Sequence, residues 1–511
     1  MLLVKLSLLS YLFTCSYAAR ILAVVFIPSL SHNLVFRPIY RELSLRGHQV
    51  VAVAPNPLND STLTNLTEID VSYVYERNKN MQSALNFDSY TEFWTNTFQW
   101  MMLPAEDILK DSRVQRLCEG GEKFDLVLLE ALLPVFYAFG TKCDAPTVGM
   151  ISMDGLLSTH SIQGSVIHPI LFDDMLLPYQ KPLGLVEKIL YVYSFLWYKW
   201  YYNYRVVPQC DSMMRKYLGQ HLPPLDEIEV NSSMAFINTN VVMNPIRPLS
   251  PTVVPMGFVQ IRAPNALSQD LQSVLDNAKE GAVYFSFGSN TKSSHLSPLM
   301  RSVIIKTFEE LPYTVLCKWE TDGVPSSKRN LVVKKWFPQA DILAHPNVKV
   351  FITHAGLQSI EESIVRGVPM VAVPLFGDQK MNAEKSAKLE IAIQLDKDTL
   401  SRDSFKSAII EVAENKRYRD RVRELKSIVE DQPMTGLERA VWWSEYVIRH
   451  RGARHLRSAV ADVSLAEYLL LDVLAAVLSV LLIAGIVSYK LARLVGKLTL
   501  CGWRRNKAKE S

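Results

Sequence analysis

The sequence lacks two features that would each indicate a whole class of function. Its formal net charge is only +4 over 511 residues, so the charge balance does not indicate a nucleic-acid partner. Its six cysteines contain no CxxC pair and no metal-ligand spacing, so no zinc module is expected. At this length the chain can hold two domains and further segments. Four cysteines lie on the body, and the sequence leaves their pairing open: Cys118, Cys143, Cys210 and Cys317.

Two apolar segments lie near the ends of the chain. Residues 1–19 combine one positive charge, an apolar run and small residues, which is the pattern of a cleaved secretory signal peptide. The run from Tyr468 to Tyr489 contains a single charge, Asp472, and exceeds the ~20 residues that span a bilayer. Residues 490–511 are basic, which predicts a cytoplasmic tail behind a transmembrane helix over 468–489.

The tail ends in Lys507-Ala508-Lys509-Glu510-Ser511, which resembles the KxKxx retrieval signal of endoplasmic reticulum membrane proteins. The alternative is a basic tail that binds anionic lipid head groups. We therefore predict a single-pass type I protein of the endoplasmic reticulum membrane with a lumenal body. Three N-x-S/T sequons, at Asn59, Asn65 and Asn231, lie in that body and are consistent with a glycoprotein.

The body begins with a predicted strand–helix–strand unit. Residues 20–27 form a continuous apolar run, typical of a buried parallel strand, and residues 48–54 form another. Apolar residues at helical spacing between them predict a helix that ends at Gly47. This order indicates a doubly wound α/β domain, in which ligands bind outside the carboxyl ends of the strands.

Polar residues follow two strands of this domain. A loop over residues 28–33 contains Ser31 and His32, and Glu130 comes directly after a strand predicted over residues 125–129. Because the carboxyl ends of parallel strands lie at one edge of a sheet, both are candidates for a site.

A proline-rich segment, residues 245–264, predicts a linker between a first domain over 20–244 and a second over 265–450. The second domain is expected to end in helices that pack back across both lobes. Before the linker, residues 183–207 are rich in Tyr and Trp. They predict a helix that lines an apolar acceptor pocket or rests on a membrane surface, or one that only packs against its domain.

The most informative stretch is VFITHAGLQSIEESIVRGVPMVAVPLFGDQ, residues 350–379. It predicts a strand, a turn around His354, a helix ended by Gly367, a strand over 368–376 and a final polar loop. Free N–H groups and a histidine at a helix N-terminus suit a diphosphate. Asp378 and Gln379, in the final loop, suit the hydroxyl groups of a sugar. We expect no Asp-x-Asp pair near a candidate strand end, and therefore no metal.

This stretch resembles the signature of the UDP-glycosyltransferases, from its strand-His-x-Gly start to its closing Pro-Leu-Phe-Gly-Asp-Gln. The resemblance covers nearly all of the body. It is strongest over residues 281–379 and implies the GT-B fold, two facing Rossmann-like domains. The anchor and the retrieval-like tail match the membrane-bound animal branch, and the first half is similar to insect members.

The resemblance implies that His32 is the general base and that a carboxylate orients it. Members of the family have an Asp at that position, whereas this chain has Glu130. The longer side chain serves only if it folds back to reach the histidine. Members of the family hold UDP-sugar as a co-substrate, with no cofactor, and the corresponding residues here are Ser289, Trp336, Gln339, His354, Gly356, Gln358, Ser359, Glu362, Asp378 and Gln379.

The resemblance therefore predicts inverting, metal-independent transfer of a hexose from a UDP-sugar to a hydroxyl of a small lipophilic acceptor. Glucose is favoured and glucuronic acid is the alternative donor sugar. Two other hypotheses remain: a membrane-tethered UDP-sugar-binding protein without catalysis, favoured by the change to Glu130, and a transferase acting on a membrane lipid. The acceptor and any homo-oligomer are left open.

Overall fold

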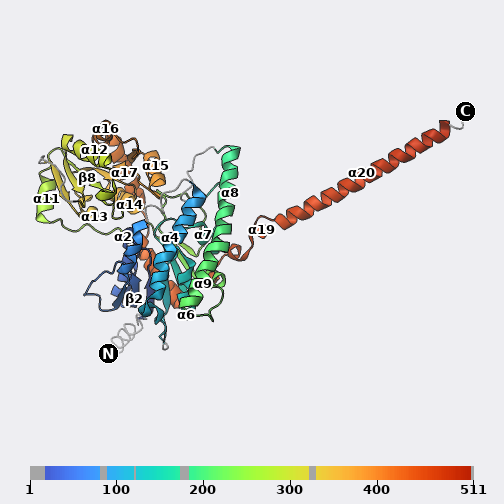
Figure 1. The fold of residues 1–511 in the computed structure, drawn as a ribbon, viewed down its shortest axis with the longest axis horizontal. Helices are drawn as coiled ribbons and strands as arrows, with labels where there is room; N and C mark the ends of the chain where they lie inside the picture. Colours follow the sequence, from blue (N-terminus) through green and yellow to red (C-terminus); the bar gives the residue numbers. More distant parts are fainter. Residues whose placement is uncertain (1–17, 81–88, 120–121, 173–182, 322–329, 508–511) are drawn as a thin grey trace, which may run out of the picture. The chain divides into compact units, whose positions relative to one another are not determined.

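The computed structural model describes residues 18–80, 89–119, 122–172, 183–321 and 330–507. The predicted signal peptide lies outside them except for its last two residues, as does the end of the tail after Lys507. The chain divides into two compact units, residues 1–457 and 458–511. The larger unit contains two parallel sheets, which we call the first and second lobes together with their helices (Figure 1).

The sheet of the first lobe has seven parallel strands in the order β3-β2-β1-β4-β5-β6-β7. The strands are β1 (Arg20–Val24), β2 (Gln49–Ala54), β3 (Leu66–Asp70), β4 (Leu126–Glu130), β5 (Thr147–Ile151), β6 (Met234–Ile237) and β7 (Val253–Pro255). The chain runs outward from β1 and returns on its other side at β4. The topological switch point, where doubly wound sheets bind ligands, therefore lies between β1 and β4.

The sheet of the second lobe has six parallel strands in the order β10-β9-β8-β11-β12-β13. The strands are β8 (Ala282–Ser286), β9 (Thr314–Lys318), β10 (Leu331–Lys334), β11 (Val348–Thr353), β12 (Met370–Ala372) and β13 (Ala392–Gln394). Its switch point lies between β8 and β11. Each lobe thus provides one crevice at the carboxyl ends of its strands.

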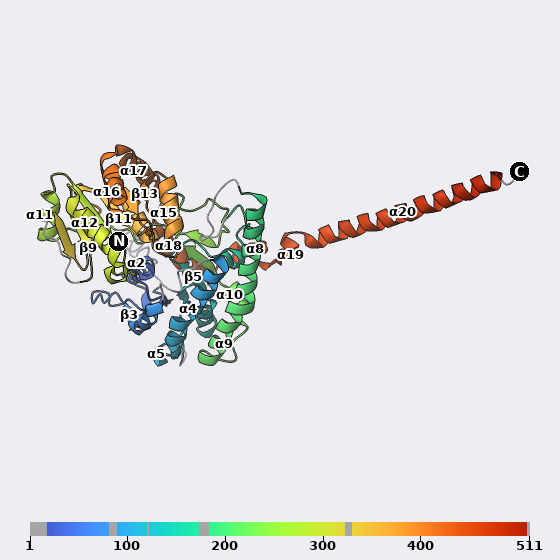
Figure 2. The ribbon, with the colours of Figure 1, turned by 45° about the horizontal axis from the view of Figure 1, so that its top comes forward.

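Helices cover both faces of the first sheet. They are α2 (Leu30–Leu45), α4 (Tyr90–Lys110), α5 (Ser112–Gln115), α6 (Ala138–Lys142), α7 (Leu157–Ile162), α8 (Leu185–Tyr201), α9 (Val207–Tyr217) and α10 (Leu225–Val230). On one face, Val35, Phe36 and Ile39 of α2 pack into a core with Ile21 and Ala23 of β1. On the other face α4 and α8 run side by side, as Figures 1 and 2 show.

The second sheet is enclosed in the same way. Its helices are α11 (Gln269–Asp276), α12 (Pro298–Glu310), α13 (Gln339–Ile342), α14 (Leu357–Arg366), α15 (Gln379–Lys388), α16 (Arg402–Glu414) and α17 (Lys416–Glu430). Leu357, Ile360 and Ile364 are the buried face of α14, and Gly367 ends that helix at φ 67°. Finally, α18 (Gly436–His450) returns to the first lobe and packs against α2.

Several predicted boundaries were wrong. Residues 30–33 are not a loop, because α2 already begins at Leu30. The predicted linker contains β7, which pairs with β6 and extends the first sheet to Pro255. The strand expected over 368–376 is reduced to β12, since the chain then turns into the cavity between the lobes. The helix α4 was not predicted.

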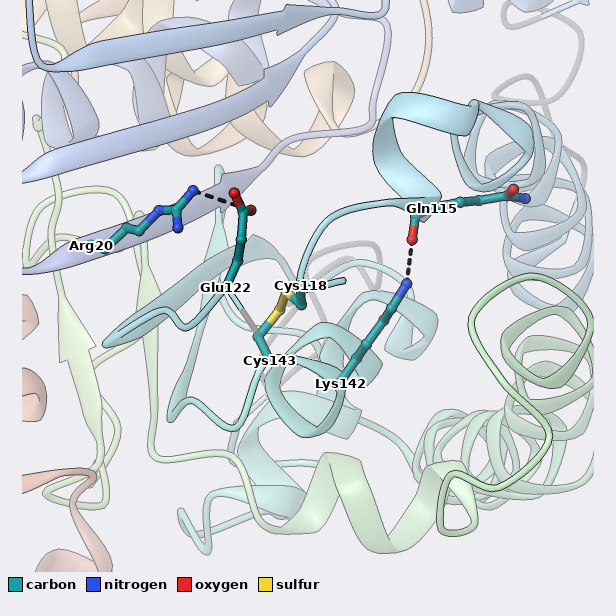
Figure 3. The surroundings of a disulfide bond; sticks show 6 residues. All are labelled: Arg20, Gln115, Cys118, Glu122, Lys142 and Cys143. Atoms are coloured by element: carbon teal, nitrogen blue, oxygen red, sulfur yellow. Dashed lines mark hydrogen bonds and ion pairs between the residues drawn. A yellow bond between two sulfur atoms is a disulfide. The ribbon is translucent and has the colours of Figure 1, made fainter. Parts of the chain in front are cut away.

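One disulfide, Cys118–Cys143, joins the segment after α5 to the end of α6 (Figure 3). Lys142 Nζ donates to the carbonyl oxygen of Gln115 beside it, and Arg20 pairs with Glu122 at 3.2 Å. Cys210 and Cys317 are buried free thiols. Disulfides persist in oxidising compartments, which is consistent with a lumenal body.

The smaller unit, residues 458–511, contains the short helix α19 (Leu465–Tyr468) and the long helix α20 (Leu471–Lys507). Between Leu471 and Leu500, α20 is long and apolar enough to cross a membrane. The predicted span over 468–489 thus falls mostly within this helix, which continues past it.

Candidate active site

A cavity of about 480 Å³ lies between the carboxyl ends of the two sheets. It brings together eleven of the twelve predicted site residues: His32, Ser289, Trp336, Gln339, His354, Gly356, Gln358, Ser359, Glu362, Asp378 and Gln379. The twelfth, Glu130, lies directly behind His32. Residues separated by more than 340 positions therefore face one another because both switch points open toward the same space.

His32 lies in the first turn of α2, at the carboxyl end of β1. Its Nδ1 is 2.7 Å from Glu130 Oε1 and 2.9 Å from Ser152 Oγ. A carboxylate only accepts hydrogen bonds, so the proton lies on Nδ1. Nε2 then carries the free lone pair, which is the arrangement that a general base needs.

Glu130 is the last residue of β4 and is fully buried. Its Oε2 accepts hydrogen bonds from the backbone N–H groups of Phe26, at 3.0 Å, and Ile27, at 2.9 Å. Its Oε1 contacts the imidazole of His32. Three donors compensate the burial of this carboxylate and fix its direction. The longer side chain of Glu therefore reaches the histidine.

His354 follows β11 at the second switch point, and two glycines make room for its ring. A Cβ atom would lie 2.6 Å from His354 Cε1 if placed on Gly288, and 2.8 Å from Nε2 if placed on Gly356. Burial and the nearby Lys318 lower the pKa of His354 to about 4. At neutral pH this imidazole is uncharged and acts as a hydrogen-bond donor.

The N-terminus of α14 points its backbone toward the same cavity. Gly356 is the N-cap residue and has no side chain to cap the helix, and Leu357 and Gln358 line the cavity. Free N–H groups at the positive end of a helix dipole attract an anion such as a diphosphate. Ala355, just before, adopts φ 64°, a conformation that usually favours glycine.

Three polar residues are held in one group beside the cavity. Gln339 Nε2 donates to Glu362 Oε2 at 2.8 Å and to Ser359 Oγ at 3.2 Å. Burial raises the pKa of the Glu362 carboxyl. The adjacent Trp336 is 58% exposed, so one face of its indole is free to stack on a planar base.

The last two predicted residues lie at the start of α15. Asp378 Oδ2 accepts from Asn382 Nδ2 at 2.6 Å, and burial raises the pKa of its carboxyl. The side-chain oxygen of Gln379 accepts from the backbone N–H groups of Leu375 and Phe376, at 2.8 and 3.1 Å. That contact fixes the loop after β12 and leaves the amide nitrogen of Gln379 as a donor.

The apolar part of the cavity wall was not predicted. It consists of Ile27, Leu30, Leu34, Phe93, Trp94, Trp100, Met101, Leu132, Met153, Leu156 and Phe376. Four of these come from α4. A signal existed, because Ser89 and Glu92 have the spacing of a capping box and Ser89 Oγ does accept from the N–H of Glu92.

Two cations that line the cavity were also missed. Lys318 Nζ donates to the carbonyl oxygen of Gly288 at 3.0 Å, is paired with Glu320, and lies 5.3 Å from the ring centre of Trp336. Arg262 makes a two-pronged ion pair with Asp341, at 2.8 and 2.9 Å. Both cations are thus compensated by carboxylates.

The aromatic stretch over 183–207 forms α8 and the π-helical turn Tyr202–Val206, and none of it lines the described cavity. Tyr198 packs edge-on against Trp94, with ring centres 5.1 Å apart, so part of the stretch supports the acceptor wall from behind. The expectation that no Asp-x-Asp pair lies near a strand end was wrong, because Asp396–Asp398 follows β13. This triplet is exposed and does not line the cavity.

Comparisons with known proteins show the family of the chain. The family model described as "UDP-glucoronosyl and UDP-glucosyl transferase" matches residues 21–502. UDP-glucosyltransferase 2 of Dactylopius coccus is 30% identical over 484 residues, which cover 92% of each chain. The ecdysteroid UDP-glucosyltransferase of Spodoptera littoralis nuclear polyhedrosis virus is 31% identical over 490 residues, 90% of this chain and 94% of the relative.

A solved structure supports the fold. Spinosyn forosaminyltransferase SpnP matches with a TM-score of 0.58 at 18% identity, covering 84% of this chain and 99% of that one. This similarity, with the two parallel sheets, confirms the predicted GT-B arrangement.

Proposed function

The chain belongs to the family of UDP-glucoronosyl and UDP-glucosyl transferases, and we propose that it transfers glucose, in preference to glucuronic acid, from a UDP-sugar to a hydroxyl of a small lipophilic acceptor. The observation that carries this proposal is a single cavity lined on one side by His32, with Glu130 behind it, and on the other by His354 and the start of α14. A base and a site for the leaving diphosphate thus lie on opposite sides of the substrates.

In the proposed reaction, Nε2 of His32 takes the proton of the acceptor hydroxyl while that oxygen forms a bond to the anomeric carbon. The bond from this carbon to the diphosphate breaks, and its electron pair leaves with UDP. Glu130 stabilises the imidazolium that forms. Attack from the side opposite UDP inverts the anomeric centre and converts an α-linked donor into a β-linked product.

The leaving charge develops beside His354 and the first N–H groups of α14. A neutral imidazole can donate one hydrogen bond to it, and the helix dipole adds a favourable field. Trp336 is assigned to the uracil face, Glu362 to the ribose hydroxyls, and Asp378 with Gln379 to the sugar. Ser289 is assigned to the diphosphate. The proposed transfer uses no metal, with UDP-sugar as a co-substrate.

The preference for glucose rests on charge. Glucuronate carries a carboxylate that needs a cation, yet Lys318 and Arg262 are already paired with Glu320 and Asp341. A neutral hexose has no carboxylate and therefore needs no cation. Two relatives with about 30% identity are glucosyltransferases by name, which favours the same sugar.

The acceptor half supports a lipophilic molecule, because its wall is built of aromatic and aliphatic side chains. We assign the acceptor to the first domain, which begins at Arg20 and includes β7, and the UDP-sugar to the second, over residues 265–450. We also propose a type I topology in the endoplasmic reticulum membrane, with α20 as the anchor. The disulfide and the exposed Asn59, Asn65 and Asn231 are consistent with a lumenal body.

The test uses membranes from cells that express the full chain, and His32→Ala as the control. UDP release is followed with UDP-glucose, UDP-glucuronate, UDP-galactose and UDP-N-acetylglucosamine against phenols, alcohols and steroids, with and without a chelator. We expect turnover with UDP-glucose that survives the chelator and falls at least 1,000-fold in His32→Ala, roughly the upper range of general-base catalysis. The product's anomeric configuration is read by NMR.

Turnover with UDP-glucuronate alone would overturn the sugar assignment and leave the transferase. An α-linked product would overturn inversion. Saturable UDP binding without turnover for any donor would show a binding protein that has kept only the donor half.

A further inference from the structure

The helix α14 carries polar residues on two sides. Ser359 and Glu362, three positions apart, lie on the side that Gln339 contacts, next to the proposed donor. Gln358 and Glu361, also three positions apart, bond to residues of the first lobe or of the segment that leads from it. Gln358 and Glu362 are four positions apart, so the two pairs lie on adjoining sides of the helix and differ in the residues that they contact.

Gln358 does not direct its side chain only at the cavity. Its Nε2 donates to the backbone carbonyl of Ser152 at 3.0 Å, across the boundary between the lobes. Ser152 follows β5, is fully buried, and presents its hydroxyl to His32 Nδ1 at 2.9 Å. A helix of the second lobe thus reaches the proposed base through one residue of the first lobe.

A second contact reinforces this junction. The fully buried Asn238 donates from Nδ2 to the same Ser152 carbonyl and to Glu361 Oε2, both at 3.2 Å. Glu361 also accepts from Asn240 at 3.3 Å and from Gln260 at 2.6 Å. The carbonyl of Ser152 therefore accepts two donors, one of them directly from α14.

These contacts matter because two side chains, Glu130 and Ser152, contact His32 Nδ1 and can orient the ring. Glu130 is fixed by two backbone N–H groups of its own lobe and does not depend on the second lobe. Ser152 Oγ is the partner whose backbone is held from across the cleft. If α14 moves away, Ser152 loses a restraint while Glu130 keeps all of its own.

We propose that Gln358 is a positioning residue that, through Ser152, orients His32 only when α14 is docked against the first lobe. This inference rests on the proposed function, since it assigns His32 as the base. The proposed donor lies against Ser359, Glu362 and the N-terminus of α14, and Gln358, on the adjoining side of the helix, sets the base. The site is therefore completed when the lobes close on the donor.

The test compares Gln358→Leu, Gln358→Asn and Ser152→Ala with the double variant Gln358→Leu/Ser152→Ala. Leu removes the amide, and Asn keeps it on a side chain one methylene too short to span the cleft. We expect each single variant to lower kcat about 3- to 10-fold, the effect of one neutral hydrogen bond. The KM for UDP-sugar and the Kd for UDP should change less than about twofold, because Ser359, Glu362 and the backbone N–H groups of α14 are unchanged.

The double variant decides how Gln358 acts. If it acts through Ser152, the double variant loses no more than the larger single loss, because both changes break one chain of contacts. Losses that multiply would overturn the proposal, as would a raised KM for UDP-sugar with kcat retained, which would mark Gln358 as a phosphate ligand. Gln209→Leu, an exposed glutamine on α9, is the matched control and should behave as wild type.

A crystal structure of Gln358→Leu gives an independent readout. We expect the His32 ring to leave its single orientation, and an unchanged ring would overturn the proposal even if kcat fell. If the wild type shows no turnover but the ring moves in the variant, the proposed function fails while the positioning role stands.

Discussion

The two halves of the cavity are built on different principles. The donor half takes its polar groups from short connections, the turn after β8, the β11–α14 junction and the start of α15. The acceptor half pairs the partly buried His32 with the buried Glu130 beside a largely apolar wall. A donor of fixed chemistry is matched by polar groups close in sequence. An acceptor is matched by shape, through side chains from distant segments.

Glu130→Gln is the sharpest way to break the polar pair while leaving both halves otherwise intact. The amide fills the same space, yet it has lost the charge that stabilises imidazolium and can donate to Nδ1, which favours the wrong tautomer. We expect kcat to fall about 100-fold, within the range for orienting carboxylates. UDP affinity, measured by calorimetry, should stay within about twofold of wild type, because Glu130 contacts only the first lobe.

Glu130→Asp is the matched control. It keeps the charge on a side chain one methylene shorter, so part of the turnover should return. A Gln variant as active as wild type would show that the carboxylate does not take part.

The elements that frame the donor half could be predicted because they follow from the local sequence. A strand, a turn with His354 and a helix ended by Gly367 follow from the spacing of apolar residues and one glycine. Once these elements form, they fix the positions of the free N–H groups and of the adjoining Ser359 and Glu362. What the sequence could not reveal is that Gln358 turns to the other lobe, since that depends on the distance between the lobes.

The acceptor half was predicted poorly, because its side chains come from segments that are far apart in the sequence. Helix α4 donates four wall residues, but its apolar side chains resemble those of any core helix. Only the position of α4 beside the cavity makes Trp94 and Met101 part of its wall. The sequence also could not show whether the Glu130 side chain reaches His32, because this depends on the backbone N–H groups of Phe26 and Ile27 that hold the carboxylate.

Trp336→Ala tests the donor half. The exposed indole should stack on uracil, and losing one such contact should weaken UDP binding about 10-fold, within the ~1–3 kcal/mol measured for stacked bases. Isothermal titration with UDP measures it. Trp200→Ala is the control, since Trp200 is an exposed tryptophan on α8 outside the cavity, 48% exposed against 58% for Trp336. Equal effects in both variants would show that Trp336 does not bind the base.

Leu34→Ala tests the acceptor half with a smaller effect. Leu34 lines the cavity and is 38% exposed, so its loss should leave the fold intact. We expect the KM for the acceptor to rise about two- to fivefold, the effect of removing a few methylene contacts. The KM for UDP-sugar should not change. Leu299→Ala, exposed on α12, is the control. A change in donor KM instead would contradict the division into two halves.

Glu229→Gln tests whether the division extends to buried acids outside the cavity. Glu229 lies in the first-lobe core, hydrogen-bonded to Tyr202, and burial raises its pKa to about 7. A carboxyl whose pKa is raised on folding stabilises the protein while protonated. That stabilisation is lost as the pH rises from the ordinary pKa of a glutamate through 7. Gln cannot titrate, so the variant should melt several degrees higher than wild type at pH 8.

At pH 5 the two proteins should melt within a degree or two of each other, since ΔTm follows the difference in free energy of unfolding. At each pH the variant should turn over as fast as wild type, because Glu229 does not line the cavity. The measurement is a thermal shift series from pH 5 to 8, with kcat at each pH. A variant that melts lower at pH 8 would show that the carboxylate stabilises this core in its charged form. A loss of turnover without a loss of stability would link this core to the acceptor wall, through Tyr202, which contacts Phe98 of α4.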